Sequence, residues 1–471
     1  MPSLPREMLE RPLPLRQGIG IAQDAVGTKD PQAQAYYDQG LAYLHSYVWI
    51  EAARSFHQAL RLDPMLAMAD VGLSYAYVEL NAPADARAAL DRARSLAAGA
   101  TAHDRRHIDL RVMQMTAEDG GASALAAYRT ALDGMVAAFP ADEELLLLRG
   151  LAESADPSER GQGSVPAAIP YYEKARALAP AHFAAHHYLT HAFENSGRAA
   201  DALKSGEAYA KMAPQVPHAV HMLGHELRRA GRIADAIKEF ERADRLEAQY
   251  LADEHVPAAH DWHYHHNLDL LGTSYQYVGR MMKAEELLKR SFELPSNTVE
   301  QELNKREWPV FLRARGRPRE ALAAADVMRS HSSRLVQAMG HVQAGLARLA
   351  LRQFDVAATD ANTALGLLRG RVSVEGAGLV APSLRQLQGE LFLLTGQREK
   401  GRSALKQTVK ELRALPGPDN WAQTTFTLEE IARTARDATD WELAAWVAQQ
   451  MSEHDPNYAG TRDALALVKK E

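Results

Sequence analysis

The chain has 471 residues, no cysteine and a formal net charge of −6. The absence of cysteine excludes disulfides, thiolate metal ligands and cysteine nucleophiles, so a metal ion would have to be bound by His, Asp, Glu or backbone oxygen. No long basic run gives the electrostatic footprint of a nucleic-acid-binding protein. Because no stretch is apolar enough to span a membrane and the N-terminal region has no apolar signal core, we expect no membrane contact and a cytoplasmic location.

The composition predicts an all-α protein. Ala and Leu are abundant, and the Val/Ile/Thr alternation that marks strands is missing. Residues 33–64 match the spacing of a tetratricopeptide repeat, which has a period of about 34 residues; the matching positions are Tyr36, Gly40, Tyr43, Ala52, Phe56, Ala59 and Pro64. The next repeat is recognisable from Ala86, Leu90 and Ala93. We therefore predict a right-handed α-solenoid of this repeat type, a superhelix of helix-turn-helix units.

The repeats suggest five segments along the chain: an N-terminal extension (1–30), N-terminal repeat-like helices (31–156), a loop at 157–165 with a connecting helix (together 157–180), histidine-rich repeats (181–296), and C-terminal repeats with capping helices at about 420–453 and 460–470 (together 297–471). Gly197, Gly231 and Gly279, each followed by Arg, mark turns in the histidine-rich segment. Further turns are predicted at Gly316, near Gln353 and at Gly396.

Histidines are concentrated in one region. The chain has 19, and 12 of them lie between His182 and His266, where an even spread would place about three. Within this region one pair of histidines, His187 and His191, recurs 34 residues later as His221 and His225. Each pair has the i, i+4 spacing of one helical turn, and the offset equals the repeat period. Both pairs should therefore face one spot from neighbouring first helices.

The repeat register assigns these side chains to the concave surface. Two imidazoles one turn apart lie about 6 Å apart at Cβ and can hold one cation. His218 and His266 share the second position of their units, and Asp269 takes the position that His187 and His221 hold. The sequence thus predicts seven candidate metal ligands: His187, His191, His218, His221, His225, His266 and Asp269. An ordinary polar or pH-sensitive groove remains the alternative.

Imidazole and carboxylate ligands suit a transition metal, Fe, Cu or Zn, and are poor for Ca²⁺ or Mg²⁺. Glu194 and Glu226 are candidates to orient an imidazole or move a proton, and Arg228 is a candidate to bind an anionic substrate group. An open coordination position would make the protein a metal-dependent enzyme, an oxidoreductase or a hydrolase. The competing hypothesis is a non-enzymatic scaffold that binds a partner protein or peptide. In either case the ligand, a small molecule or a peptide, would occupy the concave groove.

Several motifs resemble a bacterial tetratricopeptide-repeat family with histidine-rich signatures. The stretch Pro31-Gln32-Ala33-Gln34-Ala35-Tyr36-Tyr37-Asp38-Gln39-Gly40-Leu41 is similar to that family's "PQAQAFFDQGL", and the family's "NHYYIHA" and "HLVHMPAHIY" are similar to residues 186–192 and 218–227. The family's "HYYPHNL" corresponds to residues 263–268. The family's "NHAEA" is replaced by Val48-Trp49-Ile50-Glu51-Ala52, which lacks the histidine. The resemblance implies a histidine site and names no reaction.

Overall fold

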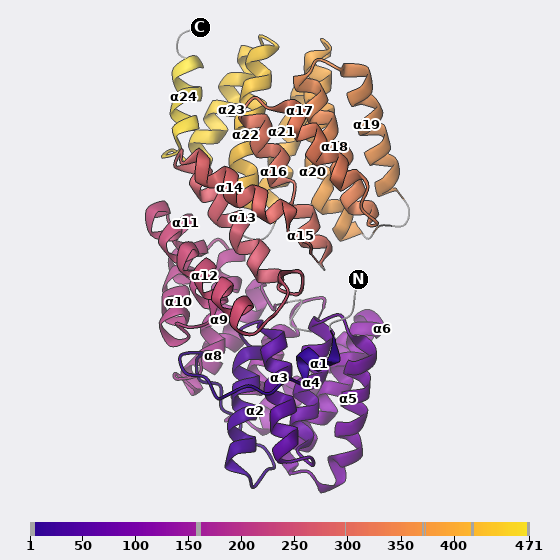
Figure 1. Cartoon of the computed structure of the whole chain (residues 1–471), viewed down its shortest axis with the longest axis vertical. Helices are drawn as coiled ribbons and strands as arrows, with labels where there is room; N and C mark the ends of the chain where they lie inside the picture. Colours follow the sequence, from indigo (N-terminus) through magenta and orange to yellow (C-terminus); the bar gives the residue numbers. More distant parts are fainter. Residues whose placement is uncertain are drawn as a thin grey trace. The chain divides into compact units, whose positions relative to one another are not determined.

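The computed structural model describes residues 5–156, 162–296, 298–369, 372, 374–415 and 419–468. Residues 157–161 of the predicted loop, the first four residues of the extension and the last two residues of the predicted helix 460–470 lie outside this range. Apart from an isolated parallel bridge between Ile21 and His182, the described residues form no β-structure. The fold is all-α and consists of tandem antiparallel helix pairs of the tetratricopeptide-repeat type, as predicted (Figure 1).

The chain divides into two compact units, Met1–Tyr250 and Leu251–Glu471. The helices that begin in the first unit are α1 (Arg6–Leu9), α2 (Pro31–Leu44), α3 (Trp49–Leu62), α4 (Ala67–Glu79), α5 (Pro83–Leu96), α6 (Ala102–Ala138), α7 (Glu143–Leu151), α8 (Ile169–Leu178), α9 (Ala184–Asn195), α10 (Ala199–Met212), α11 (Pro217–Arg229) and α12 (Ile233–Asp253), with short 3₁₀ turns η1 (Ala97–Gly99) and η3 (Pro166–Ala168). The boundary between the units falls inside the predicted segment 181–296.

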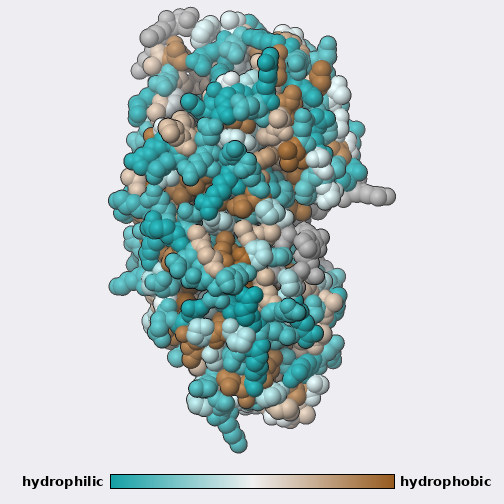
Figure 2. All heavy atoms as spheres, viewed as in Figure 1, coloured by the Kyte–Doolittle hydropathy of each residue, from teal (hydrophilic) through white to brown (hydrophobic). Residues whose placement is uncertain are grey.

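The second unit contains the turn η4 (Ala258–His260) and α13 (Trp262–Tyr277), α14 (Met281–Glu293), α15 (Val299–Asn304), α16 (Glu307–Ala314), α17 (Pro318–Arg329), α18 (Arg334–Ala350), α19 (Phe354–Leu368), α20 (Val374–Leu394), α21 (Arg398–Ala414), α22 (Asp419–Asp437), α23 (Trp441–His454) and α24 (Ala459–Val468). No helix among the described residues is both long enough and apolar enough to cross a bilayer. On the face that Figure 2 displays, most side chains are hydrophilic and the apolar ones form small separate patches.

Close contacts between small and large residues hold the helix pairs together. Phe56 on α3 is fully buried between Gly40 on α2 and Gly72 on α4, and a Cβ at either glycine would lie 2.6 Å or 2.4 Å from its ring. Burying a phenylalanine side chain contributes roughly 1.5–3 kcal/mol, and here that burial requires glycine on both neighbouring helices. The first predicted repeat therefore forms because its glycine and phenylalanine positions fit each other.

The predicted turns follow one backbone pattern. Gly197, Gly231, Gly279, Gly316 and Gly396 all have positive φ. This left-handed conformation ends a helix without the steric cost that a Cβ would add. Arg352, next to the predicted turn at Gln353, adopts φ 60° at the corresponding place. In the first repeat this position belongs to Tyr47, also with φ 60°.

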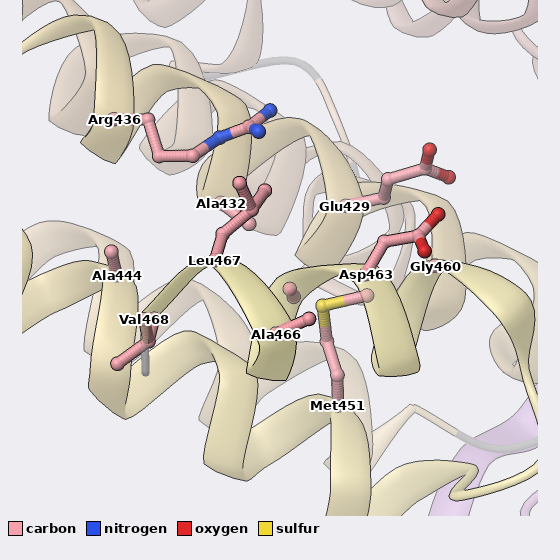
Figure 3. A pocket seen from close by; sticks show the side chains of 11 residues that line it. Glu429, Ala432, Arg436, Ala444, Met451, Gly460, Asp463, Ala466, Leu467 and Val468 are labelled. Carbon is pink, nitrogen blue, oxygen red and sulfur yellow. The ribbon is translucent and has the colours of Figure 1, made fainter. Parts of the chain in front are cut away.

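The last helices of the second unit, α22, α23 and α24, line an open pocket of about 470 Å³. Figure 3 shows Leu467 and Met451 pointing into it, with Arg436 and Glu429 at its margin. Glu429 accepts a hydrogen bond of 2.6 Å from the hydroxyl of Tyr458, which holds the chain just before α24. This polar contact fixes the position from which α24 covers the preceding helices.

Candidate metal centre

Three predicted ligands converge within the first unit. His187 and His191 lie one turn apart on α9, and His218 begins the first turn of α11. The Nε2 atom of His187 is 3.1 Å from Nε2 of His191 and 3.0 Å from Nε2 of His218. One ligand atom from each of the three residues lies within 4.8 Å of the others. All three side chains are buried.

A backbone contact fixes the tautomer of His187. Its Nδ1 atom is 2.6 Å from the carbonyl oxygen of His45, and because a carbonyl can only accept, Nδ1 must carry the proton. Burial, reinforced by the charge of His191, lowers the pKa of His187 well below its usual value. The ring is therefore neutral, with the Nε2 lone pair directed at His191 and His218. In a metal-ligating histidine, the ring nitrogen that does not bind the metal usually donates a hydrogen bond of this kind.

The spacing of the three rings can be compared with that of a metal-bound set. Both His191 and His218 direct Nε2 at Nε2 of His187, which has a single in-plane lone pair. Three nitrogens bound to one tetrahedral ion at 2.0–2.1 Å would lie about 3.3 Å from one another. The two measured N···N distances are within a few tenths of an ångström of that value.

Aromatic rings form the walls around these histidines. The ring of Tyr47 lies 4.6 Å from that of His187, 6.2 Å from His191 and 5.3 Å from His218, measured between centroids. His187 also stacks on Tyr209 at 4.7 Å. Tyr47 adopts its positive φ at this point, a conformation that costs a non-glycine residue of order 1 kcal/mol or more. Tyr47 thus places an aromatic ring against all three imidazoles.

A second buried cluster supports the first. Glu144, on α7, lies 3.1 Å from Nε2 of His45 and 3.0 Å from Nε2 of His182, and His45 Nδ1 is 2.8 Å from the hydroxyl of Tyr188. Although burial opposes ionisation, these two imidazoles hold the pKa of Glu144 well below its usual value. The carboxylate therefore stays ionised and anchors His45, the residue whose carbonyl orients His187.

The second predicted pair does not join the first. His221 and His225 contact each other, with 2.7 Å between their Nε2 atoms. We predicted that the in-phase pairs would meet at one spot; instead His218, one turn earlier on α11, completes the first pair. The contact between His187 and His218 joins residues 31 apart, three fewer than the repeat period, so equal positions of these two repeats do not meet here.

The histidines are also less accessible than we predicted. Their concave positions suggested side chains that face an open groove, but His187, His191 and His218 are at most 9% exposed. The rings of Tyr47, Tyr188 and Tyr209 cover them within their own unit. A ligand at this centre would therefore have to be an ion or a very small molecule, which argues against a peptide in direct contact with the three rings.

The acidic and basic candidates have other partners. Glu194 forms an ion pair of 2.7 Å with Arg229 and lies 3.7 Å from Nδ1 of His225. Burial and the charge of Glu194 raise the pKa of Glu226 to about 9, so this carboxyl is protonated at neutral pH. Arg228 is buried, with its guanidinium 5.8 Å from the centre of the Phe240 ring. These contacts place Glu194 beside His225, Glu226 close to the charge of Glu194, and Arg228 against Phe240.

The remaining predicted ligands belong to the second unit. His266 and Asp269 lie on α13, where both side chains are buried. In that unit the ring of His266 stacks on Trp262 at 6.1 Å. The group of three on α9 and α11 is complete without either residue.

Sequence reasoning missed the supporting residues. The sequence patterns do not single out His45, His182, Tyr47 or Glu144. His45 and Glu144 are separated by 99 residues in the chain. The one sequence feature that could have pointed to His45 is its position near the end of the first helix of a predicted repeat, next to the turn.

No protein-family model and no curated protein matches the chain. Among solved structures, it is similar to PilW, a widely conserved type IV pilus biogenesis factor, at 17% identity and a TM-score of 0.29, covering 53% of this chain and 99% of that one. It is also similar to the human IFIT1 dimer with m7Gppp-AAAA (12% identity, TM-score 0.40, 94% and 91% coverage) and to the APC/C hetero-tetramer Cut9-Hcn1 (12%, 0.38, 93% and 83%). Scores of this size carry no argument about ligands, so the candidate metal centre rests on its own geometry.

Proposed function

We propose that the first unit binds one transition-metal ion through Nε2 of His187, His191 and His218. The observation that carries this proposal is that Nε2 of His187 lies 3.0 Å from Nε2 of His218 and 3.1 Å from Nε2 of His191, with the tautomer of His187 fixed by the carbonyl of His45. Three neutral imidazoles form a ligand set for Zn²⁺, Cu²⁺ or Fe²⁺. The predicted pair His221 and His225 is then a hydrogen-bonded neighbour on α11 rather than part of the ligand set.

A set of three protein ligands leaves a coordination position for water or a small substrate, as in catalytic zinc sites. When bound there, a metal ion supplies Lewis acidity and a water molecule of lowered pKa. The protein's own contribution is to hold the imidazoles, through the carbonyl of His45, and to exclude bulk water with Tyr47 and Tyr209. The function we propose is therefore that of a metal-dependent enzyme acting on a small molecule, with the metal setting the choice between hydrolysis and oxidation.

Elemental analysis and zinc titration by calorimetry on the full chain, purified without added metal, test this proposal. We expect His191→Gln and His218→Gln each to weaken zinc binding more than about 100-fold, because changes to supporting residues alone cost 10–100-fold. His221→Gln is the matched control: it is equally buried on the same helix and should retain the affinity. Circular dichroism should show the same helicity in all three variants.

Equal losses in the control and the two ligand variants would move the centre toward His221 and His225. If the wild-type protein neither carries nor takes up metal, the metal proposal fails. The chain would then be assigned to the competing class, a scaffold that binds a partner protein or peptide through its repeats.

A further inference from the structure

A second group of metal-ligating side chains lies elsewhere in the first unit. His103 and His107 are one turn apart near the start of α6, with ring centroids 4.5 Å apart. Nε2 of His103 lies 3.0 Å from Oδ1 of Asp24 and 3.7 Å from Oδ2 of Asp142, and Nε2 of His107 lies 3.2 Å from the same Oδ2. Ligand atoms of His103, His107 and Asp142 fall within 4.8 Å of one another.

Each carboxylate has one oxygen fixed by the fold and the other directed at the histidines. Oδ1 of Asp142 accepts from the backbone N–H of Leu145 as the N-cap of α7, which leaves Oδ2 toward His103 and His107. Oδ2 of Asp24 accepts from the hydroxyl of Tyr37, which leaves Oδ1 toward His103. Oδ1 of Asp24, Oδ2 of Asp142 and the Nε2 atoms of the two histidines therefore face one another from three separate chain segments.

Asp104 supports this group without pointing into it. Its Oδ1 lies 3.1 Å from Nδ1 of His103, and its Oδ2 accepts from the N–H of Gly27 at 3.0 Å. With Nδ1 of His103 paired to a carboxylate, Nε2 is the nitrogen available to an ion. A carboxylate behind a ligating histidine is the common arrangement in protein metal sites, where it orients the ring and raises its basicity.

The charges in this group favour a divalent cation. Three carboxylates, those of Asp24, Asp104 and Asp142, surround two histidines, and Nη2 of Arg106 lies 3.6 Å from Oδ2 of Asp142. The negative charge of these carboxylates attracts a cation to this place.

We propose that His103, His107, Asp142 and Asp24 form a second, independent site for a divalent transition-metal ion, with Zn²⁺ as the best match. Two imidazoles and two carboxylates are a mixed nitrogen and oxygen set that zinc accepts in tetrahedral geometry and that the larger Ca²⁺ does not favour. Unlike the three buried histidines, this group reaches the surface: the side chain of His103 is 23% exposed. Its ion would exchange with solvent.

An ion here would fasten the N-terminal extension to α6 and α7. Asp24 and Gly27 belong to the segment of residues 18–27. This segment also contacts the chain just before α9 and α11, the helices that carry the three histidines of the first site. The carbonyl of Gly18 accepts from the N–H of Gln215, and the carbonyl of Ile21 accepts from that of Phe183. Residues 183 and 215 precede α9 and α11. The second ion would therefore stabilise the segment that lies against the starts of both helices.

Zinc titration of the full chain at pH 8, with hydrogen exchange of residues 24–28 as a second readout, tests this site. We expect wild type to bind two equivalents of Zn²⁺, and His107→Gln, Asp142→Asn and Asp24→Asn each to lose one of them or to bind it more than about tenfold more weakly. Asn at 142 keeps the helix cap, so folding should be retained. Zinc should slow exchange at residues 24–28 in wild type and leave it unchanged in these variants.

The control and the opposing outcomes separate this site from the first. His341→Gln, which removes a histidine that contacts Asp360 in the second unit, should bind as wild type does. His191→Gln should lose the other equivalent and keep this one. If His107→Gln and Asp142→Asn bind the wild-type number of ions with unchanged affinity, the second site does not exist and the group is a purely ionic anchor. If wild type binds one equivalent that His107→Gln abolishes, the first site fails and the second stands.

Discussion

The Nδ1 atom of His187 donates a hydrogen bond of 2.6 Å to the backbone carbonyl of His45, 142 residues earlier in the chain. Because the acceptor belongs to the main chain, no substitution of the His45 side chain removes it directly. The position of that carbonyl instead depends on what holds the turn after α2, and Glu144 is the buried charge that anchors His45 there. The structure thus links the metal-facing nitrogen of α9 to a carboxylate on α7.

Replacing Glu144 with Gln should weaken zinc binding at the three histidines by about tenfold while leaving every ligand in place. In the wild type the imidazoles of His45 and His182 both face the carboxylate. The glutamine amide would place its NH₂ group against one of them, so we also expect the free energy of unfolding to fall by about 1–3 kcal/mol. Calorimetry and urea denaturation measure the two effects. Glu143→Gln, at the half-buried neighbouring position, is the control; unchanged zinc affinity in the Glu144 variant would show that His45 needs no anchor.

Adding a methyl group at Gly224 should destabilise the first unit. A Cβ there would lie 2.6 Å from the ring of Phe240, so α11 and α12 would have to separate, at a cost of about 1–3 kcal/mol. Gly134→Ala on α6 is the opposite case, because nothing lies within 4 Å of its Cβ and φ is not positive. That substitution should stabilise the protein by about 0.5–1 kcal/mol. Thermal denaturation should rank Gly134→Ala above wild type and Gly224→Ala below it, and the reverse order would contradict the packing described.

A buried carboxyl in the second unit should make stability depend on pH. Burial and the nearby charge of Glu430 raise the pKa of Glu390 to about 7, above its usual 4.5. Between these values the folded protein binds more protons than the unfolded chain, so this contribution is complete below about pH 4.5 and is lost as the pH rises through 7. Glu390→Gln, which mimics the protonated form, should match wild type at pH 4.5 and be about 3 kcal/mol more stable at pH 8.

Glu430→Gln provides the contrasting variant. Burial disfavours ionisation of Glu430, but the charge of Arg313, whose Nε lies 2.7 Å away, lowers its pKa. Removing this carboxylate leaves a buried guanidinium without its counter-charge and should destabilise the unit by about 3 kcal/mol across the same pH range. Unfolding followed at several pH values distinguishes the two variants. If both had the same pH profile, Glu390 would not be the group that holds the proton.

Local sequence signals determined the helices and turns. The spacing of Gly40 and Phe56 predicted the first repeat, and Gly197 and Gly231 marked turns that take the positive φ expected of them. The 34-residue period also placed His187 and His221 on neighbouring first helices. These features depend on residues close together in the chain, where helix periodicity and glycine conformations act directly.

The composition of the two candidate sites depended on the tertiary structure. The packing of α9 and α11 brings His218, rather than His221, to His187, and this separation of 31 residues cannot be read from a repeat period of 34. His45, Glu144 and Asp24 reach the histidines only because distant helices and the N-terminal extension pack together. The sequence by itself therefore determined the helical repeats and the helix faces that carry histidines. Packing decided which nitrogen and oxygen atoms come together. The reason is that their distances depend on how helices far apart in the chain pack, and local sequence patterns do not encode this.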